Sequence, residues 1–411
     1  MDYDSVYRKI KSLHPTIETH LNHPLAPYTT LRLGGPADLF IHTTNQLQFI
    51  SILKLVHQYT LKDVGAEKEA NISKIIESEA SNFSAHSKPE VDAVKEANGA
   101  QSSESRFRDE GVSTGNSFTS QPPLTILGSG SNVLISDSGI RGIVIKNSSR
   151  YLKIQNNTSS PIPPPTLPSR LNQYDPKNYL NFQILDYDET SAPRIKVRLA
   201  SGVPLPFAIA TLIRQGVTGL QWFGYIPGTI GGAVLSNIHG GSHFFSEIIQ
   251  SVTCYDLSEG KIIKIPAGQI SWGYDHCSLA DSPHLVILSV TLNLFKGDAT
   301  KAAQTAAAWI AQKAKVQPPN SAGSVFQNPS EKDCLPIWGE PKSAGWIIDS
   351  LGWKGKSVGG AQVSPLHANF IVNTGSATAA NFYTLFTQIQ ADVLNRYHLH
   401  LEPEIKLLGN F

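Results

Sequence analysis

The chain has 411 residues, a length that predicts two or three domains rather than a single hydrophobic core. Its formal net charge of +1 gives no reason to expect a nucleic acid or an anionic membrane as a partner. The N-terminal stretch MDYDSVYRKI lacks the apolar core of a secretory signal, and no apolar run is long enough to cross a bilayer. We therefore expect a cytoplasmic protein.

The cysteines and histidines argue against a disulfide framework and against a metal centre. Cys254, Cys277 and Cys334 lie far apart and form no CxxC pair. An odd and sparse set of this kind is typical of a reducing compartment. The 13 histidines include no HExxH pattern, so we expect no bound metal.

The first part of the chain predicts a small α+β unit. Residues 28–42 and 124–147 have the pattern of short strands broken by glycine turns, and a helix is expected from Asn45 to about Tyr59. Residues 64–122 interrupt this unit. They are rich in Ser, Glu, Ala, Asn and Lys, with too few aliphatic side chains to offset the entropy of ordering. We expect a disordered or loosely helical insertion there.

A second α+β domain is expected after a proline-rich loop at residues 155–178, which contain SSPIPPPTLP. Residues 204–217 carry apolar side chains at helical spacing, and residues 219–241 form a glycine-rich turn region with an apolar middle. The strands expected in this domain are 194–202, 251–258, 261–266 and 285–295.

The last part of the chain mixes helices and strands without the regular alternation of a doubly wound sheet, so α+β is the expected fold class. An alanine-rich run from Ala299 to about Val316 favours a helix. A short helix is expected at 343–353, and strands at 368–375 and 399–409. Residues 378–397 predict an amphipathic helix whose apolar face holds Phe382, Leu385, Ile389 and Val393.

Two glycine-rich loops are candidates for binding a phosphate. The sequence GSGSN at 128–132 lies between two apolar strands and would expose backbone N–H groups that can bind an anion. The alternative is a tight turn between strands. In IPGTIGGAVLSN at 226–237, Thr229 could donate to a phosphate, or the glycines could serve only a packing bend. Two such loops without GxxxxGK favour a large phosphate-bearing cofactor over a nucleoside triphosphate.

Three further segments carry reactive side chains. In NSAGSVFQNP at 320–329, Ser324 has no neighbouring His or Asp, so a nucleophile, a proton donor and a small residue in a tight corner all remain open. Glu404 alternates with apolar neighbours and is either a solvent-facing residue or a positioned acid. In WGYDHCSL, His276 and Cys277 would point to opposite faces of a strand, which favours a structural Cys277.

Six blocks occur in an order that resembles the UDP-N-acetylenolpyruvylglucosamine reductase family, with features of its type II branch. They are TTLRLGGPADLFI, ILGSGSNVLISDSGIRGIVI, IPGTIGGAVLSN, NSAGSVFQNP, AGWIIDSLGWKGKSVGGAQVSPLHANFIVN and LEPEIKLLG. The resemblance implies a flavin-binding fold of the vanillyl-alcohol-oxidase type with a further substrate-binding α/β domain. It also implies FAD as cofactor, NADPH as reductant, a UDP-sugar substrate, a role in peptidoglycan precursor synthesis, and a monomer.

The same resemblance implies a domain layout. Residues 1–148 would form one FAD-binding lobe and 149–297 the other. Residues 298–397 would bind the substrate, and 398–411 would return to the flavin site as a strand.

The resemblance also assigns roles to individual residues. Ser324 aligns with the proton donor that completes reduction of the enolpyruvyl group, and Glu404 with a carboxyl that helps to stabilise or protonate the intermediate. Tyr274 and Asp275 fall in an active-site block. The residues implied to bind FAD are Arg32, Gly128, Ser129, Gly130, Ser131, Asn132, Pro227, Gly228, Thr229, Gly232 and Asn237.

The chain departs from the family pattern at positions that usually carry positive charge. Asp275 stands where the family has Arg, Gln327 where it often has Lys, and Gln312 near another expected Arg. Ser129 replaces a common Gly, and the run that begins at His239 also differs. The remaining candidate cations are Arg32, Lys313, Lys315, Lys354 and Lys356.

These departures leave three interpretations. The chain is a working reductase with cations recruited from elsewhere, a flavin-binding relative with lost or altered activity, or a non-enzymatic flavin-binding scaffold. Retention of Ser324 and Glu404 beside both glycine-rich loops favours the first.

Overall fold

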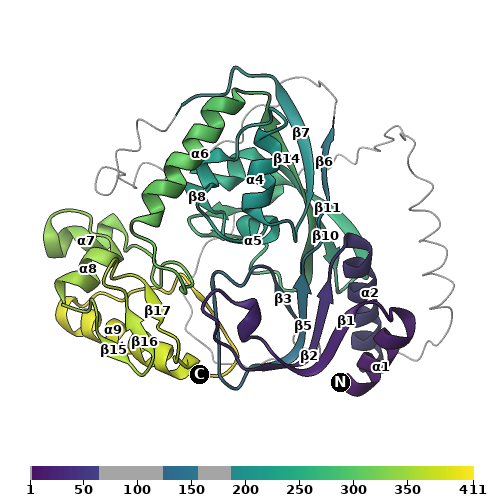
Figure 1. Ribbon diagram of the computed structural model, residues 1–411, viewed down its shortest axis with the longest axis horizontal. Coiled ribbons are helices and arrows are strands. Elements are labelled where there is room, and N and C mark those ends of the chain that lie inside the picture. The colour runs from purple at the N-terminus through teal and green to yellow at the C-terminus, as the bar shows by residue number, and fades with distance from the viewer. Residues whose placement is uncertain (1, 64–123, 156–186) are drawn as a thin grey trace, which may run out of the picture. The chain divides into compact units, whose positions relative to one another are not determined.

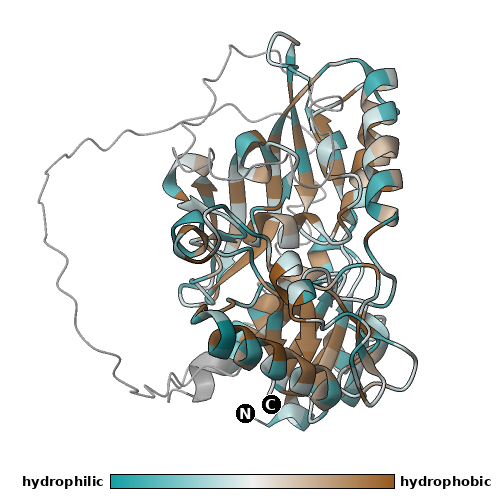
Figure 2. Ribbon diagram, turned by 90° about the vertical axis from the view of Figure 1, so that its left-hand side faces the viewer, coloured by the Kyte–Doolittle hydropathy of each residue, from teal (hydrophilic) through white to brown (hydrophobic). Residues whose placement is uncertain are grey.

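The computed structural model describes residues 2–63, 124–155 and 187–411. The expected insertion at 64–122 and all but the first residue of the expected loop at 155–178 therefore lie outside the described residues. Figure 1 shows the arrangement of the elements, and Figure 2 shows that hydrophobic residues gather in the strands. Among the described residues, no helix is long and apolar enough to cross a membrane.

The N-terminal part forms a four-stranded sheet with strand order β1-β2-β5-β3. The β1–β2 pair is antiparallel, whereas β5 lies parallel to both β2 and β3. Side chains from all these strands except β1 join a core that includes Phe40, Leu127 and Val144. The elements of this part are α1 (Tyr3–Leu13), β1 (Glu18–Pro24), η1 (Ala26–Tyr28), β2 (Pro36–Thr43), α2 (Gln46–Asp63), β3 (Leu124–Leu127), β4 (Val133–Ile135) and β5 (Ile140–Asn147).

Two features of this part differ from the prediction. Residues 28–35 do not extend the strand, because the chain turns there against the 128–132 loop, and Thr30 N donates to Gly130 O at 3.0 Å. The helix α1 and strand β1 were not expected. Helix α1 buries only Val6 and Ile10, and Asp2 caps its N-terminus. Helix α1 nevertheless has a strong amphipathic pattern, with Val6 and Ile10 four residues apart on one face, which the prediction missed.

The middle part is a five-stranded antiparallel sheet in the order β11-β10-β14-β7-β6. The four expected strands and the expected helix are confirmed within a few residues. Helix α4 packs with α5 on a core that includes Leu199, Ile209 and Val290. The elements are β6 (Leu152–Gln155), β7 (Arg194–Ala200), α4 (Leu205–Ile213), η5 (Gln221–Phe223), α5 (Ile230–Leu235), β8 (His239–Gly240), β9 (His243–Phe244), η6 (Phe245–Ile248), β10 (Ile249–Asp256), β11 (Lys261–Pro266), η7 (Ala267–Gln269), β12 (Trp272–Gly273), β13 (His276–Cys277) and β14 (Leu285–Phe295).

The C-terminal part packs helix α9 on a small antiparallel sheet, β15-β16-β17, whereas helix α6 lies against η5 and α4 of the middle part (Figure 1). Helix α9 buries the predicted apolar face, and its N-cap Thr378 accepts from Asn381 N. Only residues 406–408 of the expected strand at 399–409 are strand, so Glu404 precedes it. The elements are α6 (Ala299–Ala314), α7 (Glu331–Trp338), α8 (Ala344–Ser350), β15 (Ser357–Val358), β16 (Ala361–Val363), β17 (Ile371–Asn373), α9 (Ala379–Tyr397) and β18 (Lys406–Leu408).

Asp137 joins the N-terminal and C-terminal parts. It follows β4, and its carboxylate accepts from Ala379 N at 2.8 Å and from Ala380 N at 2.9 Å, in the first turn of α9. These N–H groups have no acceptor within the helix, and a carboxylate also complements the positive end of the helix dipole.

We predict that Asp137→Ala lowers the free energy of unfolding by about 0.5–2 kcal/mol, the usual cost of losing a helix cap. Chemical denaturation measures this change. Asp281→Ala is the matched control, because Asp281 pairs only with an exposed histidine, His276, at 2.9 Å. Equal effects of the two substitutions would contradict a specific role for Asp137.

Candidate functional site

The two glycine-rich loops predicted to bind a cofactor lie against each other. Gly128 follows β3, and Thr229 caps α5. A Cβ atom on Gly128 would lie 2.7 Å from Thr229 Oγ1, so the approach requires glycine. Ser131 Oγ also donates to Pro227 O at 3.0 Å. The structure thus brings together two segments that are about a hundred residues apart in sequence.

The 128–132 loop fits a phosphate-bearing cofactor. Gly130 has a φ of 63°, and a Cβ atom there would lie 2.2 Å from Tyr28 O. Among the described residues, the backbone N–H groups of Ser129, Gly130 and Ser131 donate no hydrogen bond. Unpaired N–H groups in such a loop form a concave anion site. A pyrophosphate group would satisfy them.

Hydrogen bonds within the protein fix the loop at 226–237. Gly228 has a φ of 148°, and Thr229 Oγ1 accepts from Gly232 N at 3.4 Å. Asn237 is buried, donates to Gly273 O at 2.8 Å and accepts from Ser246 N at 3.0 Å. The side-chain amide of Asn237 therefore has its hydrogen-bond partners within the protein.

Arg32, which the resemblance implied to bind FAD, is exposed and has a φ of 54°.

Ser324 and Glu404 lie together although 80 residues separate them. The Ser324 hydroxyl lies beside the Glu404 carboxyl and lowers the pKa of that carboxyl. Two backbone hydrogen bonds align their segments: Glu404 N donates to Val325 O, and Gln327 N donates to Glu402 O, each at 2.9 Å. The segment then continues into β18, which pairs in parallel with β4 just beyond the 128–132 loop.

Asn369 fixes the Ser324 segment from the other side and was not predicted. Its Oδ1 accepts from Phe326 N at 3.0 Å, and its Nδ2 donates to Phe326 O at 2.7 Å. Its own carbonyl accepts from Val325 N at 2.8 Å. Only the unusual position of an asparagine within the apolar run ANFIV signalled this role.

Burial and three neighbouring groups set the charge state of Glu404. Burial raises the pKa of Glu404 well above its usual value, and the negative charge of Asp275 raises it further. Lys313 and the Ser324 hydroxyl act in the opposite direction. Burial lowers the pKa of Lys313, whereas the negative charge of Glu404 raises it. Because burial is the largest cause, the protonated form of Glu404 is favoured over that of an exposed glutamate.

Asp275 is at the tip of the β12–β13 hairpin, with a φ of 53°. Its Oδ1 lies 3.5 Å from Nδ1 of His239. The other ring nitrogen, His239 Nε2, lies 3.5 Å from the hydroxyl of Tyr274. Asp275 and His239, two positions at which the resemblance implied a departure from the family pattern, thus lie close to each other.

Lys313 is the candidate cation that the structure places beside Glu404. Its ammonium group also lies 4.8 Å from the centre of the Tyr225 ring, a cation–π distance. Lys354 instead pairs with Asp349 at 2.6 Å, and Lys356 lies over the ring of Trp353 at 4.2 Å. Lys315 is exposed.

His367 is a further polar residue of the site that was not predicted. Burial is the main cause that lowers the pKa of His367 to about 4, and the positive charges of Lys313 and Lys354 lower it further. The ring is therefore neutral at neutral pH, and its Nδ1 accepts from Asn369 N at 3.2 Å. His367 thus supports the asparagine that holds the Ser324 segment.

The predicted structural role of Cys277 agrees with its surroundings. Cys277 is buried, and burial raises the pKa of its thiol. His276, its neighbour in sequence, pairs with Asp281 instead.

We predict that Glu404→Gln makes protein stability less dependent on pH. In the wild type, the unfolded chain releases the Glu404 proton near the ordinary pKa, while the folded state retains it. The free energy of unfolding therefore falls as the pH rises above that range. Glu404→Gln lacks this loss, so its stability relative to the wild type should increase with pH. Denaturation between acidic and neutral pH measures the difference.

Glu402→Gln is the matched control, because Glu402 is an exposed residue of the same segment. A stability difference for Glu404→Gln that is constant across pH would contradict the raised pKa.

Comparisons with known proteins identify the family. The family model for the UDP-N-acetylenolpyruvoylglucosamine reductase C-terminal domain matches residues 304–408, and that for an FAD binding domain matches residues 180–266. A UDP-N-acetylenolpyruvoylglucosamine reductase of Synechococcus sp. (strain RCC307) is 34% identical over 294 residues, which cover 71% of this chain and 81% of that protein. One from Acaryochloris marina is 33% identical over 293 residues, which cover 70% and 80%.

The fold agrees with this relationship. The crystal structure of UDP-N-acetylenolpyruvylglucosamine reductase from Thermus caldophilus matches with a TM-score of 0.58 at 22% identity, over 96% of this chain and 99% of that chain. The expected α+β flavin-binding fold, with a further C-terminal domain, is confirmed. The chain belongs to the UDP-N-acetylenolpyruvoylglucosamine reductase family, whose members are oxidoreductases, and its matched FAD binding domain makes FAD its cofactor.

Proposed function

We propose that this protein catalyses the FAD-dependent, NADPH-driven reduction of UDP-N-acetylenolpyruvylglucosamine to UDP-N-acetylmuramate, a step of peptidoglycan precursor synthesis. The observation that carries this proposal is the placement of Ser324 beside Glu404 and Lys313, in a segment that β18 joins to the 128–132 loop. Bound FAD would carry the hydride from NADPH to the enolpyruvyl group. The protein would then need to protonate the adjacent carbon.

Ser324 is suited to deliver that proton, and Glu404 to replace it. A serine hydroxyl is too weak an acid to act alone, so its oxygen must regain a proton as it gives one up. A protonated Glu404 can donate to Ser324 Oγ while the Ser324 proton moves to carbon. One O–H bond breaks at each residue, one forms at Ser324, and one C–H bond forms on the substrate. The negative charge ends on Glu404, beside Lys313.

Lys313 is suited to bind the carboxylate of the enolpyruvyl group. It is the cation beside the Ser324–Glu404 pair, and charge-assisted hydrogen bonds to a carboxylate are strong where water is excluded. It would also stabilise the negative charge that develops next to that carboxylate. In this way Lys313 would perform the task of the arginine that the family resemblance places at position 275.

One observation favours a second candidate function, a flavoenzyme of altered specificity. Asp275 lies near Glu404 and would repel a carboxylate that approached it directly. A relative with a neutral or cationic substrate would tolerate it. Turnover with the enolpyruvyl sugar nucleotide separates the two candidates, because NADPH consumption that depends on this substrate excludes the second.

We further infer a monomeric enzyme of the cytoplasm. The three cysteines, all free and buried, support a reducing compartment. Size-exclusion chromatography with light scattering would test the monomer.

We predict that Ser324→Ala separates the two half-reactions. NADPH should reduce the bound flavin at the wild-type rate, because Ser324 is not needed for that step. Reoxidation by the enolpyruvyl sugar nucleotide should slow by about a hundredfold or more, the usual contribution of a positioned proton donor. Stopped-flow absorbance of the flavin measures both rates. If both fell together, Ser324 would not be the proton donor.

We predict that Lys313→Met lowers kcat/KM for the enolpyruvyl sugar nucleotide by about tenfold to a hundredfold, the range for loss of one charge-assisted hydrogen bond. FAD affinity should not change. Lys315→Met is the matched control, since Lys315 is exposed two residues further along the same chain segment. Equal kinetics for both variants would show that another cation binds the substrate.

A further inference from the structure

Lys146 lies at the edge of the N-terminal sheet that faces the 128–132 loop. It is near the carboxyl end of β5, where it is aligned with Leu127 at the end of β3 and with His42 near the end of β2. Because the three strands are parallel, their carboxyl ends meet at one edge. Ligands of open α/β sheets bind outside such an edge. The Lys146 ammonium group donates to the carbonyl of Gly128, the first residue of the loop.

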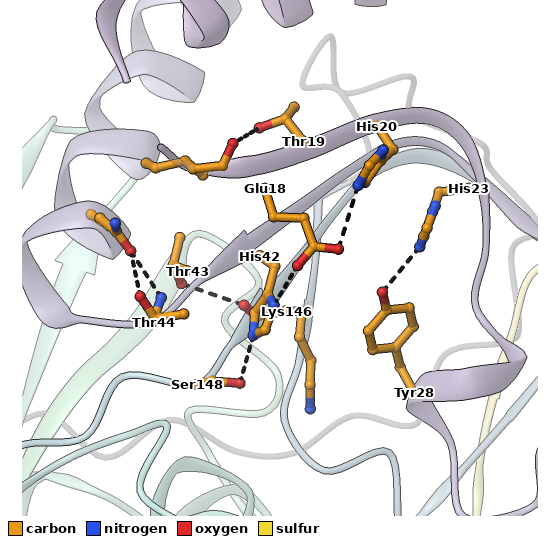
Figure 3. Close-up of polar contacts among 12 residues, drawn as sticks. Glu18, Thr19, His20, His23, Tyr28, His42, Thr43, Thr44, Lys146 and Ser148 are labelled. Carbon is orange, nitrogen blue, oxygen red and sulfur yellow. Dashed lines mark hydrogen bonds and ion pairs between the residues drawn. The ribbon is translucent and has the colours of Figure 1, made fainter. Parts of the chain in front are cut away.

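The positive charge of Lys146 has no acidic partner among the described residues. Glu18, the acid on nearby β1, is engaged by His42 at 2.9 Å and by His20 at 3.4 Å. Figure 3 shows the Lys146 side chain extending away from these contacts. Burial lowers the pKa of Lys146, and no carboxylate opposes that effect.

A half-buried ammonium group at this position raises the free energy of the folded protein unless an anion pairs with it. Buried charges in proteins are nearly always paired, because removal from water is otherwise unfavourable. The neighbouring carbonyl of Gly128 offers only a dipole. The unpaired N–H groups of Ser129, Gly130 and Ser131 follow immediately in the same loop. The ammonium therefore lies at the first residue of a loop whose next three N–H groups are unpaired among the described residues, and a ligand with several anionic oxygens could be bound by both.

We propose that Lys146 binds the pyrophosphate of FAD, as the cation that complements the backbone N–H groups of the 128–132 loop. The proposal rests on FAD being the cofactor, and it adds a residue outside the loops that the sequence pattern indicates. NADPH and the UDP-sugar also carry a pyrophosphate. We assign the site to FAD because Lys146 donates to the first residue of the glycine loop itself.

The test compares FAD with riboflavin, which has the same ring system but no phosphate. Apoprotein of the full-length chain is titrated with each flavin, and quenching of flavin fluorescence gives the dissociation constants. The variants are Lys146→Met, which keeps the chain length without the charge, and Lys146→Arg, which keeps the charge. Lys153→Met on β6 is the matched control at an exposed lysine.

For Lys146→Met we expect FAD affinity to fall by about tenfold to a hundredfold, as for loss of a charge-assisted hydrogen bond. Riboflavin affinity should be unchanged, and Lys146→Arg should retain most of the FAD affinity. Added salt should weaken FAD binding more in the wild type than in Lys146→Met, because salt screens the lost charge pair. The melting temperature of the Lys146→Met apoprotein should not fall, since the charge removed is half-buried and has no acidic partner among the described residues.

Three results would overturn the proposal. An equal loss of riboflavin and FAD affinity, with a lower melting temperature of the apoprotein, would mean that Lys146 only orders the loop. Unchanged FAD affinity with a raised KM for NADPH or for the sugar nucleotide would assign Lys146 to another pyrophosphate. Failure of the wild-type protein to bind FAD would overturn the cofactor assignment as well, and so is distinguishable from a failure of Lys146 alone.

Discussion

The site depends on how the last segment of the chain is held between two distant parts of the fold. On one side, Glu404 N and Gln327 N make backbone hydrogen bonds that tie this segment to the Ser324 segment. On the other, Lys406 N donates to Asn132 O at 3.1 Å, and β18 pairs with β4. The same few residues therefore fix both the proposed proton donor and the end of the proposed phosphate loop. Such a connection is rigid because backbone groups rather than flexible side chains make it.

The electrostatics of the site follow from this placement. Glu404 lies next to one positive and one negative residue, Lys313 and Asp275, and its burial already disfavours the ionised form of its carboxyl. An arginine at position 275 would have favoured the ionised carboxylate. Here His239 Nδ1 lies 3.5 Å from Asp275 Oδ1, and a positive charge comes from helix α6 through Lys313.

Sequence reasoning worked where local pattern decides the structure. Helix α9 has a strong apolar periodicity and a capping box, so both its face and its start were predictable. The glycine-rich loops were recognisable because close backbone approach requires glycine, as the contact between Gly128 and Thr229 shows. Ser324 and Glu404 were found by family resemblance, since nothing near either residue in the sequence reveals the partner. Their assigned roles remain predictions.

Sequence reasoning failed where distant residues decide the structure. Residues 399–405 alternate like a strand, yet their hydrogen bonds go to the irregular Ser324 segment, which no local pattern shows. Asn369 and His367 acquire their roles only through side-chain contacts made in the folded state. The sequence shows Lys146 only as a polar residue near the end of a strand, because its hydrogen-bond partner Gly128 lies in the loop after another strand.

The proposed mechanism requires that Glu404 is protonated at neutral pH, so that it can donate a proton to Ser324 Oγ. Infrared difference spectroscopy between the wild type and Glu404→Gln at neutral pH tests this most directly, because a neutral carboxyl group and a carboxylate absorb at separate frequencies. The account predicts that the wild type shows a neutral carboxyl C=O band that is absent from Glu404→Gln. Loss of a carboxylate band instead, with no neutral band lost, would contradict it.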